Sequence, residues 1–134
     1  MWKGYDDKIA KDICYNCGSP VSKQTYAYFR TALHYNPDKV WSEILDGKAL
    51  YFATRAKNHV RLIEIAVHRD VQGQGVGKKV LFRLLSQMKQ AGLYKLTFRT
   101  PIAEEAQNFW LHIGAKIVGL KGEDYEMEIT IKKE

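Results

Sequence analysis

The sequence predicts an α/β or α+β protein in which helices flank a mixed sheet and a helical segment comes first. From residue 49 onward, the apolar residues follow the order strand, strand, helix, strand, helix, strand, strand. Before residue 48 their spacing is mostly helical. With 134 residues, the chain is expected to form one domain, residues 1–134, around one core.

Three helical stretches are expected in the first 47 residues. "DDKIAKDIC" has an apolar i, i+4 pair, and "SKQTYAYFRTALHY" has apolar residues every three or four positions, with Ser22 as its N-cap. "NPDKVWSEILDG" (36–47) is expected to be the clearest helix of this half. Asn36 can cap it, Pro37 fits its first position and Gly47 can end it.

The remaining chain is expected to carry the sheet. "KALYFATR" (48–55) and "VRLIEIAV" (60–67) are predicted to form a hairpin around the turn "AKNH". Apolar residues at three- and four-residue steps predict a helix from Val76 to Gly92. Further strands are expected at 94–100, 115–120 and 125–131, and a helix at 101–114 that begins at Pro101.

Composition limits the classes of function. The net charge is +6 with a pI near 9.3, but the basic residues are scattered, so nucleic acid is not the favoured partner. No apolar run is long enough to span a bilayer and the N-terminus lacks the apolar stretch of a secretory signal, so we expect no membrane and a cytoplasmic protein. Cys14 and Cys17 have no second ligand pair, so we expect reduced thiols and no metal.

Three alternate glycines, Gly73, Gly75 and Gly77, lie between the second strand of the hairpin and the following helix. Glycine reaches positive φ, and consecutive N–H groups there can form a concave nest at the positive end of the helix. Such a nest binds phosphate or pyrophosphate, with Lys78 adding charge. A tight turn without a ligand is the alternative. The spacing fits neither the Walker A loop nor the Rossmann fingerprint.

Two motifs in the same order resemble the GNAT superfamily of N-acetyltransferases. "QGQGVG" (72–77) fits the acyl-CoA loop pattern Gln/Arg-x-x-Gly-x-Gly/Ala at every fixed position. "FWLHIGAKIVG" resembles the second signature, an aromatic pair on a helix that ends in glycine before a strand. The resemblance covers about residues 48–131, and it implies a mixed, mostly antiparallel sheet.

The resemblance also implies the donor. Acetyl-CoA would be the co-substrate, and an unidentified amine would attack its thioester directly in a ternary complex. Main-chain groups before the loop would pair with the pantetheine arm, and one N–H would polarise the thioester carbonyl. The residues expected to bind the cofactor are Ile65, Ala66, Val67, Gln72, Gly73, Gln74, Gly75, Val76, Gly77, Lys78, Asn108 and Trp110.

The catalytic residues are assigned from the residues around these motifs. Many family members use a Tyr as general acid where this chain has Trp110, and an indole N–H is no general acid near neutral pH. Glu64, on the strand that leads into the loop, is the candidate base, and His112, near Trp110, is a second candidate acid or base. His68 is expected to point to solvent.

Two other functions stay open. A CoA-binding regulatory or interaction module would bind acetyl-CoA without releasing thiol to any amine. A basic nucleic-acid-binding domain would show salt-dependent binding that acetyl-CoA does not displace. A second copy of the chain, forming a homodimer, is a further open partner. The sequence does not indicate whether the acceptor amine belongs to a small molecule or to a protein.

Overall fold

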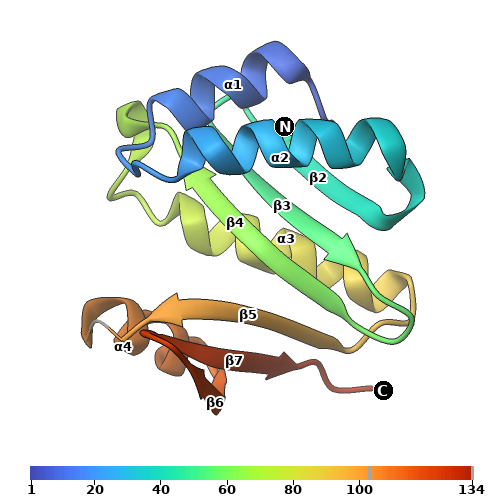
Figure 1. Ribbon diagram of the computed structural model, residues 1–134, viewed down its shortest axis with the longest axis vertical. Helices are drawn as coiled ribbons and strands as arrows, with labels where there is room; N and C mark the ends of the chain where they lie inside the picture. Colours follow the sequence, from blue (N-terminus) through green and yellow to red (C-terminus); the bar gives the residue numbers. More distant parts are fainter. Residues whose placement is uncertain (103, 134) are drawn as a thin grey trace.

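The computed structural model describes residues 1–102 and 104–133, and within them the chain forms one seven-stranded sheet (Figure 1). The strand order is β1-β2-β3-β4-β5-β7-β6, and only β4 and β5 run parallel. The expected mixed, mostly antiparallel sheet is confirmed. The strands are β1 Trp2–Gly4, β2 Val40–Leu45, β3 Ala49–Arg55, β4 Val60–Val67, β5 Lys95–Pro101, β6 Lys116–Lys121 and β7 Asp124–Thr130.

Helices cover the two faces unequally. The helices are α1 Asp7–Tyr15, α2 Ser22–Tyr35, α3 Val76–Gln90 and α4 Glu104–Ile113, with short 3₁₀ turns at Pro37–Lys39 and Arg69–Val71. The pair α1 and α2 lies in front of β2, β3 and β4 in Figure 1, whereas α3 lies behind the sheet. Trp110 and Ile113 of α4 pack against the same cluster as α3, so α4 belongs to the α3 face. No helix of the described residues lies in front of β5 and β7 (Figure 1).

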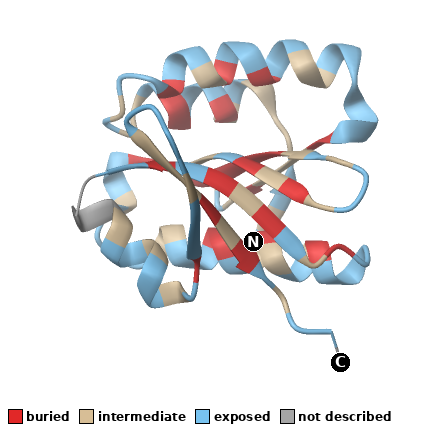
Figure 2. Ribbon diagram, turned by 60° about the horizontal axis from the view of Figure 1, so that its bottom comes forward, coloured by how far each residue is buried: buried red, intermediate tan, exposed pale blue. Residues whose placement is uncertain are grey.

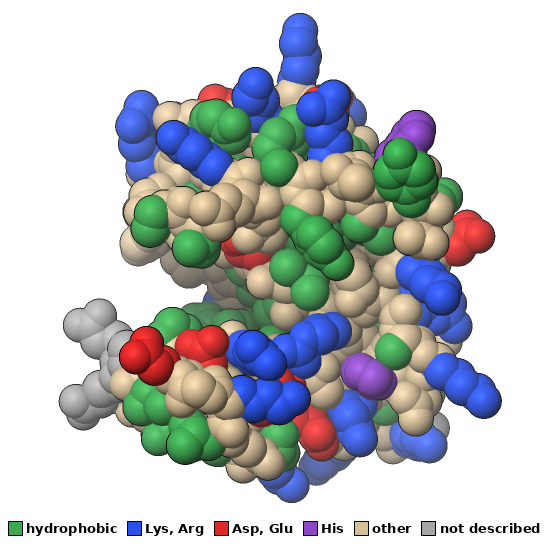
Figure 3. Space-filling view, in the orientation of Figure 1, with side chains coloured by type: hydrophobic (Ala, Val, Ile, Leu, Met, Phe, Trp, Pro, Cys, Tyr) green, Lys and Arg blue, Asp and Glu red, His purple; other side chains and the backbone are tan. Residues whose placement is uncertain are grey.

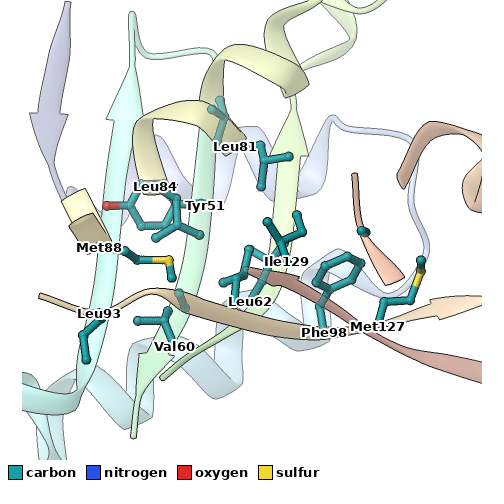
Figure 4. Packing of buried hydrophobic residues seen from close by; sticks show 14 of the residues in the cluster. Tyr51, Val60, Leu62, Leu81, Leu84, Met88, Leu93, Phe98, Met127 and Ile129 are labelled. Carbon is teal, nitrogen blue, oxygen red and sulfur yellow. The ribbon is translucent and has the colours of Figure 1, made fainter. Parts of the chain in front are cut away.

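Two apolar clusters hold these layers together. Under α3, Leu84 and Met88 pack on Tyr51 and Leu62 of the sheet (Figure 4). Under α1 and α2, the Phe29 ring stacks on Phe52 at 4.2 Å between centroids. Buried residues gather in the central strands (Figure 2), and their side chains belong to one cluster on each face of the sheet. Each fully buried Leu or Phe stabilises the fold by roughly 1.5–3 kcal/mol.

The predicted helix at 36–47 is wrong. Only a 3₁₀ turn forms at Pro37–Lys39, and the rest is the strand β2 between β1 and β3. Val40 and Ile44 face the α1–α2 cluster, while Trp41 packs against the α3 cluster. Because both faces of β2 meet apolar clusters, its apolar residues do not alternate simply with polar ones and imitate helical spacing.

A hairpin turn follows β2. Asp46 and Gly47 have φ of 51° and 69°, and the Lys48 N–H donates to the Leu45 carbonyl at 2.9 Å. Positive φ at both central residues is the geometry for which Asp-Gly turns are selected between antiparallel strands. The dipeptide "DG" at Asp46-Gly47 therefore marks a hairpin turn, although Gly47 was expected to end a helix.

Two helix starts also differ from expectation. Ser22 is not an N-cap but the first helical residue of α2, and Val21 in front of it makes no side-chain cap. Pro101 ends β5, and α4 begins at Glu104. The predicted hairpin, the long helix α3 and the last two strands are confirmed to within two residues.

Candidate active site

The sheet opens between its two parallel strands. β4 and β5 pair only at Val60 with Leu96 and at Arg61 with Thr97. Beyond these positions β4 stays with β3, and β5 stays with β7. Figure 3 shows the result as a deep notch between the upper and lower parts of the molecule. We call the paired part of β4 its closed end and residues 63–67 its open end.

The open end presents main-chain groups to this notch. The His68 N–H donates to the Lys48 carbonyl at 2.7 Å, so His68 and its alternate neighbours Ala66 and Glu64 direct their main-chain groups toward β3. Ile65 and Val67 direct theirs the other way, toward the notch. Of the three β4 residues expected to pair with a cofactor, the ladder with β3 thus leaves two, Ile65 and Val67, directed at the notch.

A bulge interrupts β4 just before these residues. Glu64 pairs with Phe52 and Leu62 pairs with the next residue, Ala53, which leaves Ile63 as the extra residue. A bulged residue has no partner position on the neighbouring strand, and bulges re-aim the backbone around them. The backbone of β4 therefore turns at Ile63, where the notch begins.

The glycine loop follows the open end of β4 and leads into α3. Gly73 and Gly75 have φ of 77° and 73°, and a Cβ built on either would meet no atom within 4 Å. Their conformation favours glycine, and the space around them is open. Gly77 has no positive φ, and a Cβ there would touch only the Val67 side chain at 3.9 Å. The backbone conformation therefore favours glycine at two of the three positions, Gly73 and Gly75.

Unpaired N–H groups gather at the same place. Gly75 precedes α3 without a side-chain cap, and the first helical bond runs from the Lys79 N–H to the Gly75 carbonyl at 3.3 Å. The N–H groups of Val76, Gly77 and Lys78 come before that bond. They lie at the positive end of a 15-residue helix, a site suited to an anionic group such as pyrophosphate.

The side-chain amide of Gln72 donates two hydrogen bonds to main-chain carbonyls. Its Nε2 donates to the Cys17 carbonyl at 2.7 Å and to the Val67 carbonyl at 2.9 Å. The side chain therefore ties the α1–α2 connection to the open end of β4. Its neighbours in the loop, Gln74 and Lys78, are exposed.

Glu64 lies in a hollow of about 410 Å³ at the open end. Its side chain accepts a hydrogen bond from the hydroxyl of Ser22, which is fully buried at the start of α2. This contact places Glu64 on the α1–α2 face of the sheet. The lining residues are Cys17, Ser19, Val21, Ser22, Thr25, Ile63, Glu64, Ile65, Ala66, Val67 and Gln72.

The two cysteines differ in their surroundings. Cys14 is buried, and burial raises the pKa of its thiol from 9.0 to about 12, with the Glu64 charge nearby as a smaller cause. Cys17 lines the hollow and its thiol lies 3.5 Å from the Cys14 carbonyl. Within residues 1–102 and 104–133, no group of three His, Cys, Asp or Glu side chains is placed to hold a metal ion.

The residues of α4 are placed on the other face. Trp110 is half-buried against Phe98 of β5, with 4.2 Å between ring centroids. Asn108 and His112 are exposed. Because α4 packs on the α3 face and Glu64 points to the α1–α2 face, the structure does not bring Glu64 and His112 together. Residue 103 and the side chains of residues 104–106 lie outside the part of the chain that the structure describes.

His68 is another difference from expectation. Its side chain is buried, not solvent-facing, and its Nδ1 accepts from the Asp70 N–H at 3.1 Å. It thereby supports the 3₁₀ turn that leads from β4 into the glycine loop.

None of the helices in the described part of the chain is long and apolar enough to cross a membrane.

Sequence reasoning missed two parts of the site. The first is Ser22, because a serine before an apolar helical pattern is typical of an N-cap. The second is the Ile63 bulge, which the continuous strand-like pattern of 60–67 does not reveal. Both depend on a partner element that is distant in the sequence, namely β4 for Ser22 and β3 for Ile63.

Solved structures with the same architecture are known. The ribosomal-protein-S18-alanine N-acetyltransferase from Escherichia coli superposes with a TM-score of 0.80 at 17% identity, over 100% of this chain and 95% of that one. The PaiA N-acetyltransferase from Thermoplasma acidophilum, solved in complex with coenzyme A, gives 0.79 at 12% identity, over 97% and 98% of the two chains. At these identities the likeness establishes the fold.

The sequence itself identifies the family. By sequence, no curated protein matches the chain closely enough to count as a relative. The sequence model described as Acetyltransferase (GNAT) family, however, matches residues 14–115, which include β4, the glycine loop and α4. Because it covers most of the 134 residues, this match shows that the chain belongs to the GNAT acetyltransferase family.

Proposed function

We propose that this chain transfers the acetyl group of acetyl-CoA to a primary amine by direct attack within a ternary complex. The observation that carries the proposal is the continuity of two features. The unpaired main-chain edge at Ile65 and Val67 leads along β4 to the N–H groups at the start of α3. An extended arm that ends in a pyrophosphate has the chemistry to occupy both.

The loop and the first turn of α3 would hold the pyrophosphate. Gly73 and Gly75 keep the anion site open, and the N–H groups of Val76, Gly77 and Lys78 donate to it. The positive φ at both glycines and the free space beside them fit such a group. A side chain at either position would be strained by the positive φ, and a carboxylate there would repel the pyrophosphate.

The open edge of β4 would orient the pantetheine arm. The N–H and C=O groups of Ile65 and the N–H of Val67 offer the pairing that β5 does not supply at this level, while the Val67 carbonyl is held by Gln72. An N–H at or beside the Ile63 bulge would polarise the thioester carbonyl. Acetyl-CoA supplies the activated acetyl group, and the protein contributes mainly by positioning the two reactants.

Glu64 is the base in this proposal. It lies in the hollow beside the bulge, and the Ser22 hydroxyl fixes its side chain. A carboxylate there can take a proton from the attacking amine, directly or through a water molecule. His112 receives no role, because it lies on the opposite face. Trp110 packs on Phe98 and supports β5, the opposite wall of the notch.

A thiol-release assay tests the proposal. With acetyl-CoA and a panel of small amines, amino acids, polyamines and peptides, we expect free CoA to appear with at least one acceptor. Acetyl-CoA should also raise the melting temperature, because it binds the folded chain only. A chain that neither binds acetyl-CoA nor releases thiol would contradict the proposal.

The second candidate is a CoA-binding regulatory module, which the lack of a hydroxyl at Trp110 favours. It predicts the same thermal stabilisation without thiol release. Both candidates suit the reducing cytoplasm, where the free thiols of Cys14 and Cys17 persist.

A further inference from the structure

We infer that the amine acceptor carries an anionic group, a carboxylate or phosphate, beside its amine, and that Arg99 binds this group. The inference rests on the proposed function and names the substrate class of the same site. Three observations support it: the position of Arg99 on β5 beside the notch, the net positive charge of its cluster with Arg61 and Glu126, and the lack of a covering helix among the described residues in Figure 1.

Arg99 and Glu64 lie on opposite walls of the notch and on the same face. Arg61 contacts Thr97 and Glu126 on this face, and Arg99 follows Thr97 by two residues along β5. Glu64 is three residues beyond the last paired position of β4, and Arg99 is two beyond that of β5. At about 3.3 Å per residue, these offsets are roughly 10 and 7 Å. Both residues therefore lie close, along their own strands, to the point at which β4 and β5 part.

Two guanidinium groups share one carboxylate at this point. Arg61 binds Glu126 with both terminal nitrogens, at 2.9 and 3.2 Å, and also donates to the Thr97 hydroxyl at 3.3 Å. Arg99 approaches Glu126 only through Nε, at 3.7 Å. Glu126 is therefore satisfied by Arg61, and the cluster of Arg61, Arg99 and Glu126 keeps one positive charge.

Arg99 is also accessible. Its side chain is 50% exposed, whereas Glu126 is 13% exposed beneath it. The α1–α2 pair covers β2 to β4 only, so the front of β5 lies open, and Figure 3 shows charged side chains along the lower edge of the notch. A planar guanidinium with free donors binds carboxylate and phosphate oxygens in a two-point geometry.

The consequence is selectivity by charge. An amine that carries a carboxylate or phosphate would be held by Arg99 while its nitrogen reaches the hollow at Glu64. A polyamine would bring further positive charge toward Arg61 and Arg99 and be disfavoured. The acceptor is thus expected to be zwitterionic or acidic and not polycationic.

Matched acceptors test the inference with the full chain. The pairs are β-alanine with β-alaninamide and O-phosphoethanolamine with ethanolamine, measured by thiol release at saturating acetyl-CoA. We expect kcat/KM about tenfold or more higher for at least one anionic member than for its neutral partner. Which pair shows the larger ratio distinguishes carboxylate from phosphate. Spermidine is expected to be poorer than either anionic acceptor.

Two variants assign the effect to Arg99. Arg99→Gln should bring the anionic-to-neutral ratio toward one and leave the KM for acetyl-CoA unchanged. Lys95→Gln is the control. Lys95 is 51% exposed and lies on the same face of β5 as Arg99, four residues nearer the closed end. It should keep the ratio.

The outcomes separate this inference from the function on which it rests. Thiol release with no preference for the anionic members, or a preference that persists in Arg99→Gln, overturns the inference alone. A raised KM for acetyl-CoA in Arg99→Gln without a change of ratio also overturns it, since Arg99 would then serve the donor. No thiol release by the wild type with any acceptor overturns the proposed function and this inference together.

Discussion

The two ends of β4 have the same secondary structure and opposite consequences. At its closed end, Val60 and Arg61 pair with β3 on one side and β5 on the other. At its open end, Ile65 and Val67 have β3 on one side and the notch on the other. The bulge at Ile63 separates the two ends of the strand. The site thus arises where a neighbouring strand withdraws. In the proposed function, a few unpaired main-chain groups become binding groups because the rest of the sheet holds them in place.

The side chains differ in the same sense. Arg61 at the closed end joins β4, β5 and β7 through Thr97 and Glu126. Glu64 at the open end is held from one side only, by Ser22 of α2. Changes at the open end should therefore alter binding and chemistry, whereas changes at the closed end should alter stability.

The largest effect is expected from Gly75→Asp. The substitution puts a Cβ at a positive φ and a carboxylate into the anion site, so acetyl-CoA affinity should fall more than about 100-fold by calorimetry. Gly92→Asp is the matched control, because Gly92 has a φ of 74° just past the other end of α3. It should lose about 1 kcal/mol of stability and keep acetyl-CoA binding. Equal loss of affinity in both variants would contradict an anion site at the loop.

Glu64→Gln should give the next largest effect. The amide keeps the shape but is no base, so kcat should fall roughly 100-fold while the KM for acetyl-CoA stays constant in steady-state kinetics. Ser19→Ala is the control, because Ser19 lines the same hollow without a bond to Glu64. Unchanged kcat in Glu64→Gln would remove Glu64 from the chemistry.

A thiol reagent can map the open end. The raised pKa of Cys14, about 12, keeps that thiol protonated at pH 8, so a disulfide reagent such as DTNB should modify Cys17. Because Cys17 lines the hollow, acetyl-CoA at ten times its Kd should slow the reaction about tenfold. The control is Arg55→Cys in a Cys17→Ser background, an exposed position opposite Val60 at the closed end, and its labelling should not slow. Equal protection at both positions would contradict an open-end site.

Arg61→Gln tests the closed end and should have the smallest effect. Removing the charged hydrogen bonds to Glu126 should lower the free energy of unfolding in urea by about 1 kcal/mol. Arg55→Gln, an exposed arginine on β3 at the same end, is the control and should change it by less than about 0.5 kcal/mol. Equal losses in the two variants would mean that the ion pair contributes nothing specific.

The same ion pair predicts a pH dependence. The hydrogen bond from Arg61 lowers the pKa of Glu126 below its ordinary 4.5 in the folded chain. The pair therefore stabilises the fold above about pH 4.5, and this contribution is lost as the pH falls through the lower folded-state pKa. The stability difference between wild type and Arg61→Gln should be full at pH 7 and shrink below pH 4.5. A difference that stays constant down to pH 3 would contradict this assignment.

Much of the second half of the molecule could be read from sequence. The alternation in β7, the helical spacing of α3 and the glycine loop are local patterns, each with a physical cause within a few residues. The order of the two motifs placed the chain in its family, and the matching family model confirms that placement. The helices α1 and α2 were also predicted with nearly correct limits.

In the first half, the sequence predicts the wrong element where burial on both faces of a strand removes the alternation of apolar and polar residues. Residues 40–45 imitate helical spacing because β2 faces an apolar cluster on each side. The Asp-Gly turn after it was a local signal for a hairpin, and it outweighs the helix-like spacing once the strand β3 is considered as a partner.

The sequence by itself determined where the proposed anion site lies, since Gly73, Gly75 and the start of α3 are contiguous in the chain. Only the tertiary structure decided what surrounds that point. The parting of β4 from β5, the bond from Ser22 to Glu64 and the shared charge of Arg61, Arg99 and Glu126 each join residues that are 36 or more positions apart or lie on different strands. Local propensity cannot encode such contacts, because they form only when the apolar clusters fix the strands and helices against one another.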